Sequence, residues 1–228
     1  MPPVLIKVCG MTTPEAVCAA AECGADMIGF VFFAKSPRNL SISRARELKA
    51  SLAGRAQTVA LVVNADDGDI GEIVRGLQPD WLQLHGAESP ERVADIRASF
   101  GVPILKAVGI AGSGDLARAE AYLEIADSLL LDAKPPKDLA LPGGNGLSFD
   151  WTLAREFSAR SRGKSWLLAG GLTPENVGDA IRLTRARGVD VSSGVEDGPG
   201  EKSVAKIQAF IAAARRAQDQ LGLTPGSV

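Results

Sequence analysis

A chain of 228 residues, 46% of them hydrophobic and 23% charged, is long enough for one large globular domain with a full core. A net charge of −2 without a basic block argues against nucleic acid or an anionic membrane as a partner. We expect a cytoplasmic protein, because no signal peptide or bilayer-length apolar run is apparent and three cysteines, an odd number, favour free thiols.

Eight short apolar runs recur along the chain and predict strands. Each run is mostly apolar rather than alternating, which is typical of parallel strands that are buried on both faces. The expected strands are residues 4–8, 26–33, 58–63, 81–84, 103–108, 128–132, 166–169 and 189–192.

Helix signals stand between most of these runs. The first helix has Thr13 as N-cap, Pro14 at its first position and Gly24 as its stop. Further helices are expected over 43–52, 89–100 and 203–220, and another is expected to open at 173–176. In the last helix, one apolar stripe contains Val204, Ile207, Phe210 and Ile211.

The alternation of strands and helices continues without an interdomain linker. It predicts an α/β fold, a single-domain (β/α)₈ barrel over residues 1–222, with a frayed tail at 223–228. Such barrels usually have about 250 residues, so this one is compact. The one long loop, 133–148, is rich in proline and glycine, and loops of this length are usually functional or disordered.

Polar and glycine-rich segments follow the predicted strands on their C-terminal side, where barrels of this kind build their active sites. Cys9 ends the first strand and Asp132 ends the sixth. The small-residue loops after strands seven and eight, together with the glycines of the long loop, predict a phosphate site built from backbone amides. Their members are Gly143, Gly144, Gly146, Gly170, Gly171, Ser192, Ser193 and Gly194.

Lys7 and Cys9 are two residues apart on a strand, so their side chains share a face. A neighbouring ammonium group is expected to lower the pKa of the Cys9 thiol and to raise its thiolate fraction. The alternative is a small buried cysteine that packs as a hydrophobe. Cys18 and Cys23 lie on the first helix and are not expected to take part in chemistry.

Three other polar residues, Asp132, Arg38 and His85, have two interpretations each. Asp132 is either an acid or base or a loop anchor, and Arg38 either pairs with a carboxylate or is a solvated loop arginine. Gln83 and His85 share a strand face that points to the same pocket, although His85 could be a structural hydrogen-bonding residue. No residue spacing matches a metal site, so we expect no metal and no cofactor.

The chain resembles the phosphoribosylanthranilate isomerase family of tryptophan biosynthesis. The matching segments follow the family's order over nearly the whole chain: KVCGMTTPEA, ADMIGFVFFAKSPRNLS, WLQLHG, ILKAVG, LLLDAK, GGNG, LAGGLTPENV and GVDVSSGVEDGPGEK. KVCG, SPR, QLHG and DVSSGVE are highly specific in combination.

The resemblance implies a cofactor-free Amadori rearrangement of N-(5-phosphoribosyl)anthranilate to 1-(2-carboxyphenylamino)-1-deoxyribulose 5-phosphate. It implies Cys9 as general base, Asp132 as general acid and Arg38 as the residue that binds the anthranilate carboxylate. The glycine loops would bind the phosphate, and Lys7, Gln83 and His85 would belong to the substrate site. Asn145 stands where a serine or threonine is expected. The partner is therefore a small molecule, and the protein is a monomer or a homodimer.

Three alternatives remain at this point. The isomerase of histidine biosynthesis performs the same rearrangement but uses two aspartates and a substrate with two phosphates. Indoleglycerol-phosphate synthase shares the anthranilate moiety but has lysine- and glutamate-rich first strands. A non-catalytic sugar-phosphate-binding barrel would share the fold without turnover.

Overall fold

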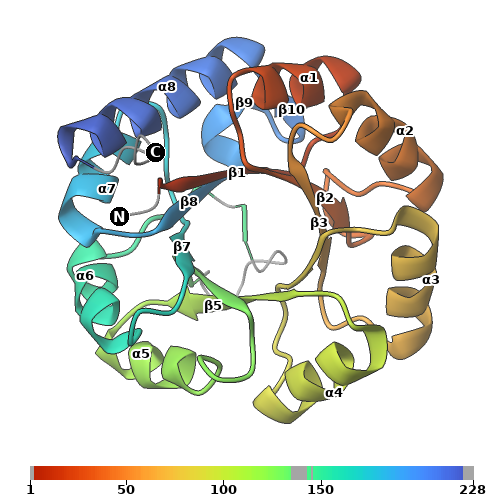
Figure 1. Cartoon of the computed structure of the whole chain (residues 1–228), viewed down its shortest axis with the longest axis horizontal. Helices are drawn as coiled ribbons and strands as arrows, with labels where there is room; N and C mark the ends of the chain where they lie inside the picture. Colours follow the sequence, from red (N-terminus) through yellow and green to blue (C-terminus); the bar gives the residue numbers. More distant parts are fainter. Residues whose placement is uncertain (1–2, 135–142, 145, 223–228) are drawn as a thin grey trace, which may run out of the picture.

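The computed structural model describes residues 3–134, 143–144 and 146–222. Eight parallel strands pair in chain order and close into a barrel, and helices surround it (Figure 1). The strands are β1 (Leu5–Cys9), β2 (Met27–Phe32), β3 (Gln57–Val62), β4 (Trp81–Leu84), β5 (Ile104–Ile110), β6 (Ser128–Ala133), β7 (Trp166–Leu168) and β8 (Gly188–Val191). This architecture confirms the predicted single-domain (β/α)₈ barrel, and every strand lies within two residues of its expected bounds.

The helices alternate with the strands. They are α1 (Pro14–Glu22), α2 (Ile42–Leu52), α3 (Asp67–Leu77), α4 (Pro90–Phe100), α5 (Ser113–Glu120), α6 (Trp151–Arg160), α7 (Val177–Thr184) and α8 (Val204–Gln220). Within the described ranges, no helix is both long and apolar enough to cross a membrane.

Several helices begin directly after a residue whose side chain caps the helix N-terminus. The Thr13 and Ser89 hydroxyls accept hydrogen bonds from the backbone N–H groups three residues further on, as expected for N-caps. Helix α2 is capped by Ser41, so its predicted start at Ser43 was two residues late. The predicted start of α7 at 173–176 was early, because the Asn176 side chain accepts from the backbone N–H of Thr173 and donates to the carbonyl of Gly171. These bonds close a turn, and the helix begins only at Val177.

The core has an inner and an outer part. Side chains alternate along each strand, so one set fills the barrel and the other packs beneath the helices. The inner cluster contains Met27, Val59, Leu105, Ala107, Leu130, Leu167 and Ala169. In α8 the stripe of Ile207, Phe210 and Ile211 is buried, whereas Val204 is 38% exposed and does not belong to it.

A short antiparallel hairpin follows β8 and was not predicted. The 3₁₀ turn η1 (Ser193–Val195) leads into β9 (Glu196–Gly198), which pairs with β10 (Glu201–Lys202). In Figure 1 this hairpin lies beside β1 and α1. The predicted tail at 223–228, Asn145 and most of the predicted loop 133–148 lie outside the described residues.

Candidate active site

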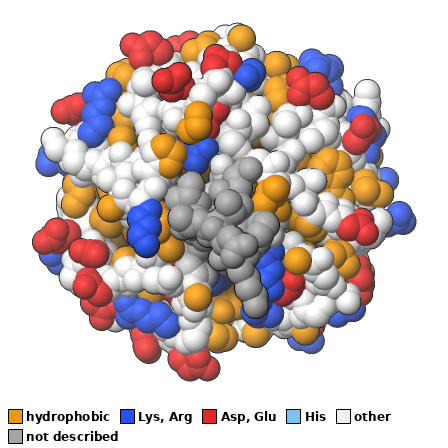
Figure 2. Space-filling view, turned by 180° about the vertical axis from the view of Figure 1, so that it is seen from behind, with side chains coloured by type: hydrophobic (Ala, Val, Ile, Leu, Met, Phe, Trp, Pro, Cys, Tyr) orange, Lys and Arg blue, Asp and Glu red, His pale blue; other side chains and the backbone are white. Residues whose placement is uncertain are grey.

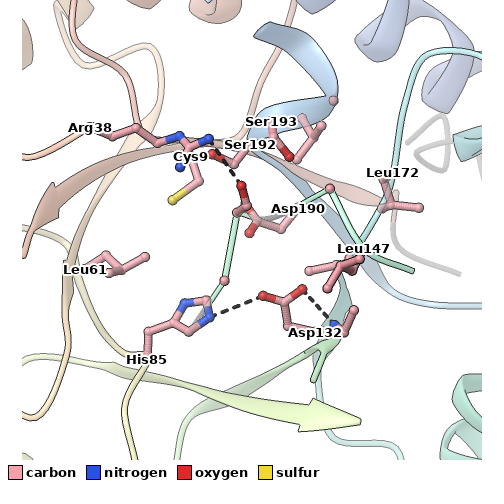
Figure 3. A pocket seen from close by; sticks show the side chains of 18 of the residues that line it. Cys9, Arg38, Leu61, His85, Asp132, Leu147, Leu172, Asp190, Ser192 and Ser193 are labelled. Carbon is pink, nitrogen blue, oxygen red and sulfur yellow. Dashed lines mark hydrogen bonds and ion pairs between the residues drawn. The ribbon is translucent and has the colours of Figure 1, made fainter. Parts of the chain in front are cut away.

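One pocket opens at the C-terminal ends of the strands. It is lined by residues at or just after the ends of strands β1, β2, β3, β4, β6, β7 and β8, and Figure 3 shows several of them facing a common space. The lining contains the predicted residues Cys9, Arg38, His85, Asp132, Gly143, Gly144, Gly146, Gly170, Gly171, Ser192, Ser193 and Gly194. The structure therefore brings together the thiol, the carboxylate and the small-residue loops.

Two predicted residues lie beneath this pocket rather than in its lining. Lys7 and Gln83 are fully buried inside the barrel. Each contacts a residue of the lining: Lys7 Nζ donates to Asp190 Oδ1 at 2.8 Å, and Gln83 Nε2 lies 2.8 Å from His85 Nδ1. Their influence on a ligand is therefore indirect.

Asp190 was missed by the sequence analysis although it lies within DVSSGVE. The register of β1 and β8 places Asp190 directly opposite Lys7, so the two charges form a buried pair at the pocket floor. The pair explains how a lysine is tolerated inside the barrel, because an unpaired buried charge is costly. Burial lowers the pKa of Lys7, but Asp190 and Cys9 together outweigh it and raise that pKa above its ordinary value.

Lys7 lowers the pKa of the Cys9 thiol, as expected, but it does not make the thiol more acidic than usual overall. Burial raises the pKa of Cys9 above its ordinary value, and this effect exceeds the opposing attraction of Lys7. The Asp190 carboxylate raises the pKa further, and Lys202 lowers it. A cation two residues away on the strand was visible in the sequence, whereas its neutralising partner on β8 was not.

Asp132 lies between a backbone N–H group and the ring of His85. Its Oδ1 accepts from the backbone N–H of Ala133 at 2.8 Å, and its Oδ2 lies 3.2 Å from Nε2 of His85 (Figure 3). Because an amide nitrogen can only donate, Nδ1 of His85 accepts from Gln83 Nε2, and the other ring nitrogen, Nε2, faces Asp132. Backbone from Gly143 lies against both groups, since a Cβ there would come within 2.6 Å of His85 Nε2 and 2.7 Å of Asp132 Oδ2.

Arg38 is buried and is not a solvated loop arginine. Its Nε and Nη2 donate to the two carboxylate oxygens of Glu196, each at 2.7 Å, and Nη2 also donates to the carbonyl of Gly144 at 3.3 Å. Lys202 Nζ donates to the same Glu196 at 2.6 Å. Glu196 is the first residue of the three-residue strand β9, and Lys202 ends the two-residue strand β10. The sequence analysis missed both because strands this short leave no periodic pattern.

Apolar side chains form the remaining wall. Val31 and Phe33 come from β2 and the residue after it, and Leu61 and Val63 come from β3 and the residue after it. They lie on the Arg38 side of the mouth, because Arg38 follows the same strand β2. The pocket thus combines an apolar wall, a buried guanidinium and two amide-rich loops.

Charges of both signs are spread over the face opposite to that of Figure 1. In Figure 2 lysine, arginine and acidic side chains are mixed around its edge, without an extended basic area in the visible part. Within the described residues, no cluster of histidine, cysteine and acidic side chains could hold a metal ion.

Comparison with known proteins gives the family. Residues 6–213 match the family described as N-(5'phosphoribosyl)anthranilate (PRA) isomerase. The chain belongs to this family. The N-(5'-phosphoribosyl)anthranilate isomerase of Nitrobacter hamburgensis is 51% identical over 218 residues, with 96% of each chain covered.

Solved structures of PRA isomerases share the fold. Phosphoribosyl anthranilate isomerase from Thermotoga maritima has a TM-score of 0.83 at 38% identity, over 93% of this chain and 99% of that chain. A PRA isomerase in complex with reduced 1-(o-carboxyphenylamino)-1-deoxyribulose 5-phosphate has a TM-score of 0.81 at 36% identity, with the same shares covered. The resemblance seen in the sequence motifs is confirmed, and the expected class of enzyme, an isomerase of tryptophan biosynthesis, is that of the PRA isomerase family.

Proposed function

We propose that this chain catalyses the Amadori rearrangement of N-(5-phosphoribosyl)anthranilate, with Asp132 as general acid and Cys9 as general base. The observation that carries the proposal is that both groups line one pocket with Arg38 and the glycine loops. Cys9 comes from β1 and Asp132 from β6, so they approach a ligand from different sides of the barrel. An acid and a base on separate sides are what a proton transfer between two substrate atoms needs.

Asp132 protonates the furanose ring oxygen, and the ring opens to a protonated Schiff base. The carboxylate that remains accepts a hydrogen bond from the backbone N–H of Ala133 and lies 3.2 Å from Nε2 of His85. His85 and Gln83 therefore serve the acid rather than the substrate directly.

The Cys9 thiolate removes the proton from C2 of the open-chain sugar. The electron pair of that C–H bond moves toward the iminium, giving an enolamine that tautomerises to the ketone. The substrate's own iminium accepts the electrons, so the residues need only move protons. Lys7 and Lys202 stabilise the thiolate electrostatically once it forms.

Substrate binding uses the other groups of the lining. The anthranilate ring packs against the apolar wall of Val31, Phe33 and Leu61, with its carboxylate toward Arg38. The phosphate lies at the loops after β7 and β8 and at Gly143, Gly144 and Gly146, where backbone N–H groups suit an anion. These loops belong to the same pocket, which supports one substrate spanning it.

A fluorescence assay that follows the loss of enzymatically generated phosphoribosylanthranilate tests the proposal. We expect turnover that persists after exhaustive chelation and is competitively inhibited by inorganic phosphate. The diphosphorylated substrate of the histidine-pathway isomerase is the comparison compound. Absence of phosphoribosylanthranilate turnover by the folded protein would favour the non-catalytic sugar-phosphate-binding barrel.

A further inference from the structure

The β9–β10 hairpin places one carboxylate between two buried cations. Glu196 Oε1 accepts from Arg38 Nε at 2.7 Å and from Lys202 Nζ at 2.6 Å. Its Oε2 accepts from Arg38 Nη2 at 2.7 Å and from the backbone N–H of Gly200 at 3.2 Å. The side chains of Arg38, Glu196 and Lys202 are only 6%, 4% and 1% exposed, so the triad is almost completely removed from water.

We propose that Glu196 is a positioning residue that gives the site its selectivity for a carboxylate on the aromatic ring of the substrate. It binds one edge of the Arg38 guanidinium and thereby directs the opposite edge into the pocket. This inference rests on the proposed function and names the part of the substrate that the triad recognises.

The free edge of the guanidinium faces the pocket. Nε and one N–H of Nη2 form the edge that Glu196 occupies, and the second N–H of Nη2 donates to the carbonyl of Gly144, which leaves Nη1 for a ligand. Nη1 has no hydrogen bond to the described residues, and a Cβ on Gly144 would lie 2.8 Å from it. The absence of a side chain at Gly144 leaves room at Nη1, whose two N–H groups can donate to a carboxylate of a ligand.

The charges of the triad do not cancel. Arg38 and Lys202 carry two positive charges against the one negative charge of Glu196, whereas Lys7 with Asp190 and Lys206 with Asp197 are paired one to one. Buried charge that is not compensated is unfavourable. One carboxylate of a ligand at the open edge of Arg38 would complete the balance.

The hairpin holds Glu196 in place through three loops of the mouth. Thr12 in the loop after β1 donates from its hydroxyl to the carbonyl of Gly200 at 3.2 Å. Lys202 Nζ donates to the carbonyl of Ser192 after β8 at 2.9 Å, and Arg38 itself belongs to the loop after β2. A carboxylate fixed from three sides can hold the guanidinium in one orientation, as a positioning role requires.

The test compares two substrates with Glu196→Gln and a matched control, Glu201→Gln. One substrate is N-(5-phosphoribosyl)anthranilate, and the other is N-(5-phosphoribosyl)aniline, which lacks the ring carboxylate. We expect Glu196→Gln to lower kcat/KM for the anthranilate substrate by about 10- to 100-fold, mainly through KM, because a misplaced binding group costs on this order. For the aniline substrate the change should stay below about threefold, and Glu201→Gln, an exposed residue of the same hairpin, should change neither.

A double variant, Glu196→Gln with Lys202→Met, separates position from charge and also serves if the single variant does not fold. It removes one negative and one positive charge, so Arg38 keeps a site of unchanged net charge but loses its anchor. Loss of selectivity between the two substrates supports the proposal. Equal losses for both substrates, or selectivity retained in the double variant with an unchanged melting temperature, would overturn it. Failure of the unmodified protein to turn over phosphoribosylanthranilate would instead overturn the proposed function.

Discussion

The two sides of the pocket place their proposed catalytic groups in opposite kinds of environment. Cys9 lies among formal charges, with Lys7, Asp190 and Lys202 all influencing its thiol. Asp132 is contacted instead by the backbone N–H of Ala133 and by the imidazole ring of His85. One fold can run acid and base chemistry together when the environments of the two groups differ in this way.

The difference follows from the chemistry of the two groups. A thiol is a weak acid with a pKa near about 8.5, so a buried one needs nearby cations to become a thiolate. A carboxylic acid ionises readily, and its task is to release a proton to the substrate and to be stabilised afterwards. Cations serve the first group and hydrogen-bond donors serve the second.

Removal of either proposed catalytic group should have the largest effect on turnover. We expect Cys9→Ala and Asp132→Asn each to lower kcat by about 10²- to 10⁴-fold, the usual contribution of a positioned acid or base. Cys9→Ser should not rescue, because a serine hydroxyl is far less acidic than a thiol. Cys18→Ala and Cys23→Ala, with thiols on or just after α1, are the matched controls. Near-normal turnover of Cys9→Ala would remove Cys9 from the role of base.

The charged side should depend on its buried ion pair for stability. Lys7→Met leaves the Asp190 carboxylate in the barrel without its partner 2.8 Å away. Breaking such a pair commonly costs about 3–5 kcal/mol of unfolding free energy. The double variant Lys7→Met with Asp190→Leu removes both charges and should recover most of that loss. Denaturant unfolding measures both variants, and equal stabilities for the single and the double variant would mean that Asp190 does not need Lys7.

The two sides of the pocket also show which parts of the site could be predicted from the sequence. The strand ends were predictable because parallel buried strands are uninterrupted apolar runs, and a barrel brings all their C-terminal ends to one mouth. Cys9, Asp132 and the glycine loops could therefore be placed in one pocket. Their charged partners could not be predicted, because these lie far away in the sequence. Asp190 is 183 residues from Lys7, and Glu196 is 158 residues from Arg38. Contacts over such separations depend on register and on a short hairpin, which leave no periodic pattern in the chain.

The activity of Asp132 should depend on the Nε2 atom of His85, which faces its carboxylate. Because Gln83 donates to Nδ1, the Nε2–H group faces Asp132, and a glutamine at position 85 can place an N–H near that site. An asparagine reaches only the nearer ring position. We therefore expect His85→Gln to retain about tenfold more kcat than His85→Asn, a difference typical of an orienting hydrogen bond. Equal losses in the two variants would indicate that His85 acts through its size or its contact with substrate.

The smallest effect tests whether burial or charge dominates at Cys9. Burial raises the pKa of Cys9, so the thiolate, which is the form that reacts with iodoacetamide, accumulates only at a pH above that for free cysteine. The alkylation rate of Cys9, followed by peptide mass, should still be rising at a pH where that of free cysteine has levelled off. Lys202→Met removes a cation that lowers this pKa, and should move the profile to still higher pH.

A substrate analogue should protect Cys9 from alkylation but leave Cys18 and Cys23 unprotected. A profile shifted below that of free cysteine would mean that the cations outweigh burial, and the charged side would then supply a thiolate even before substrate binds.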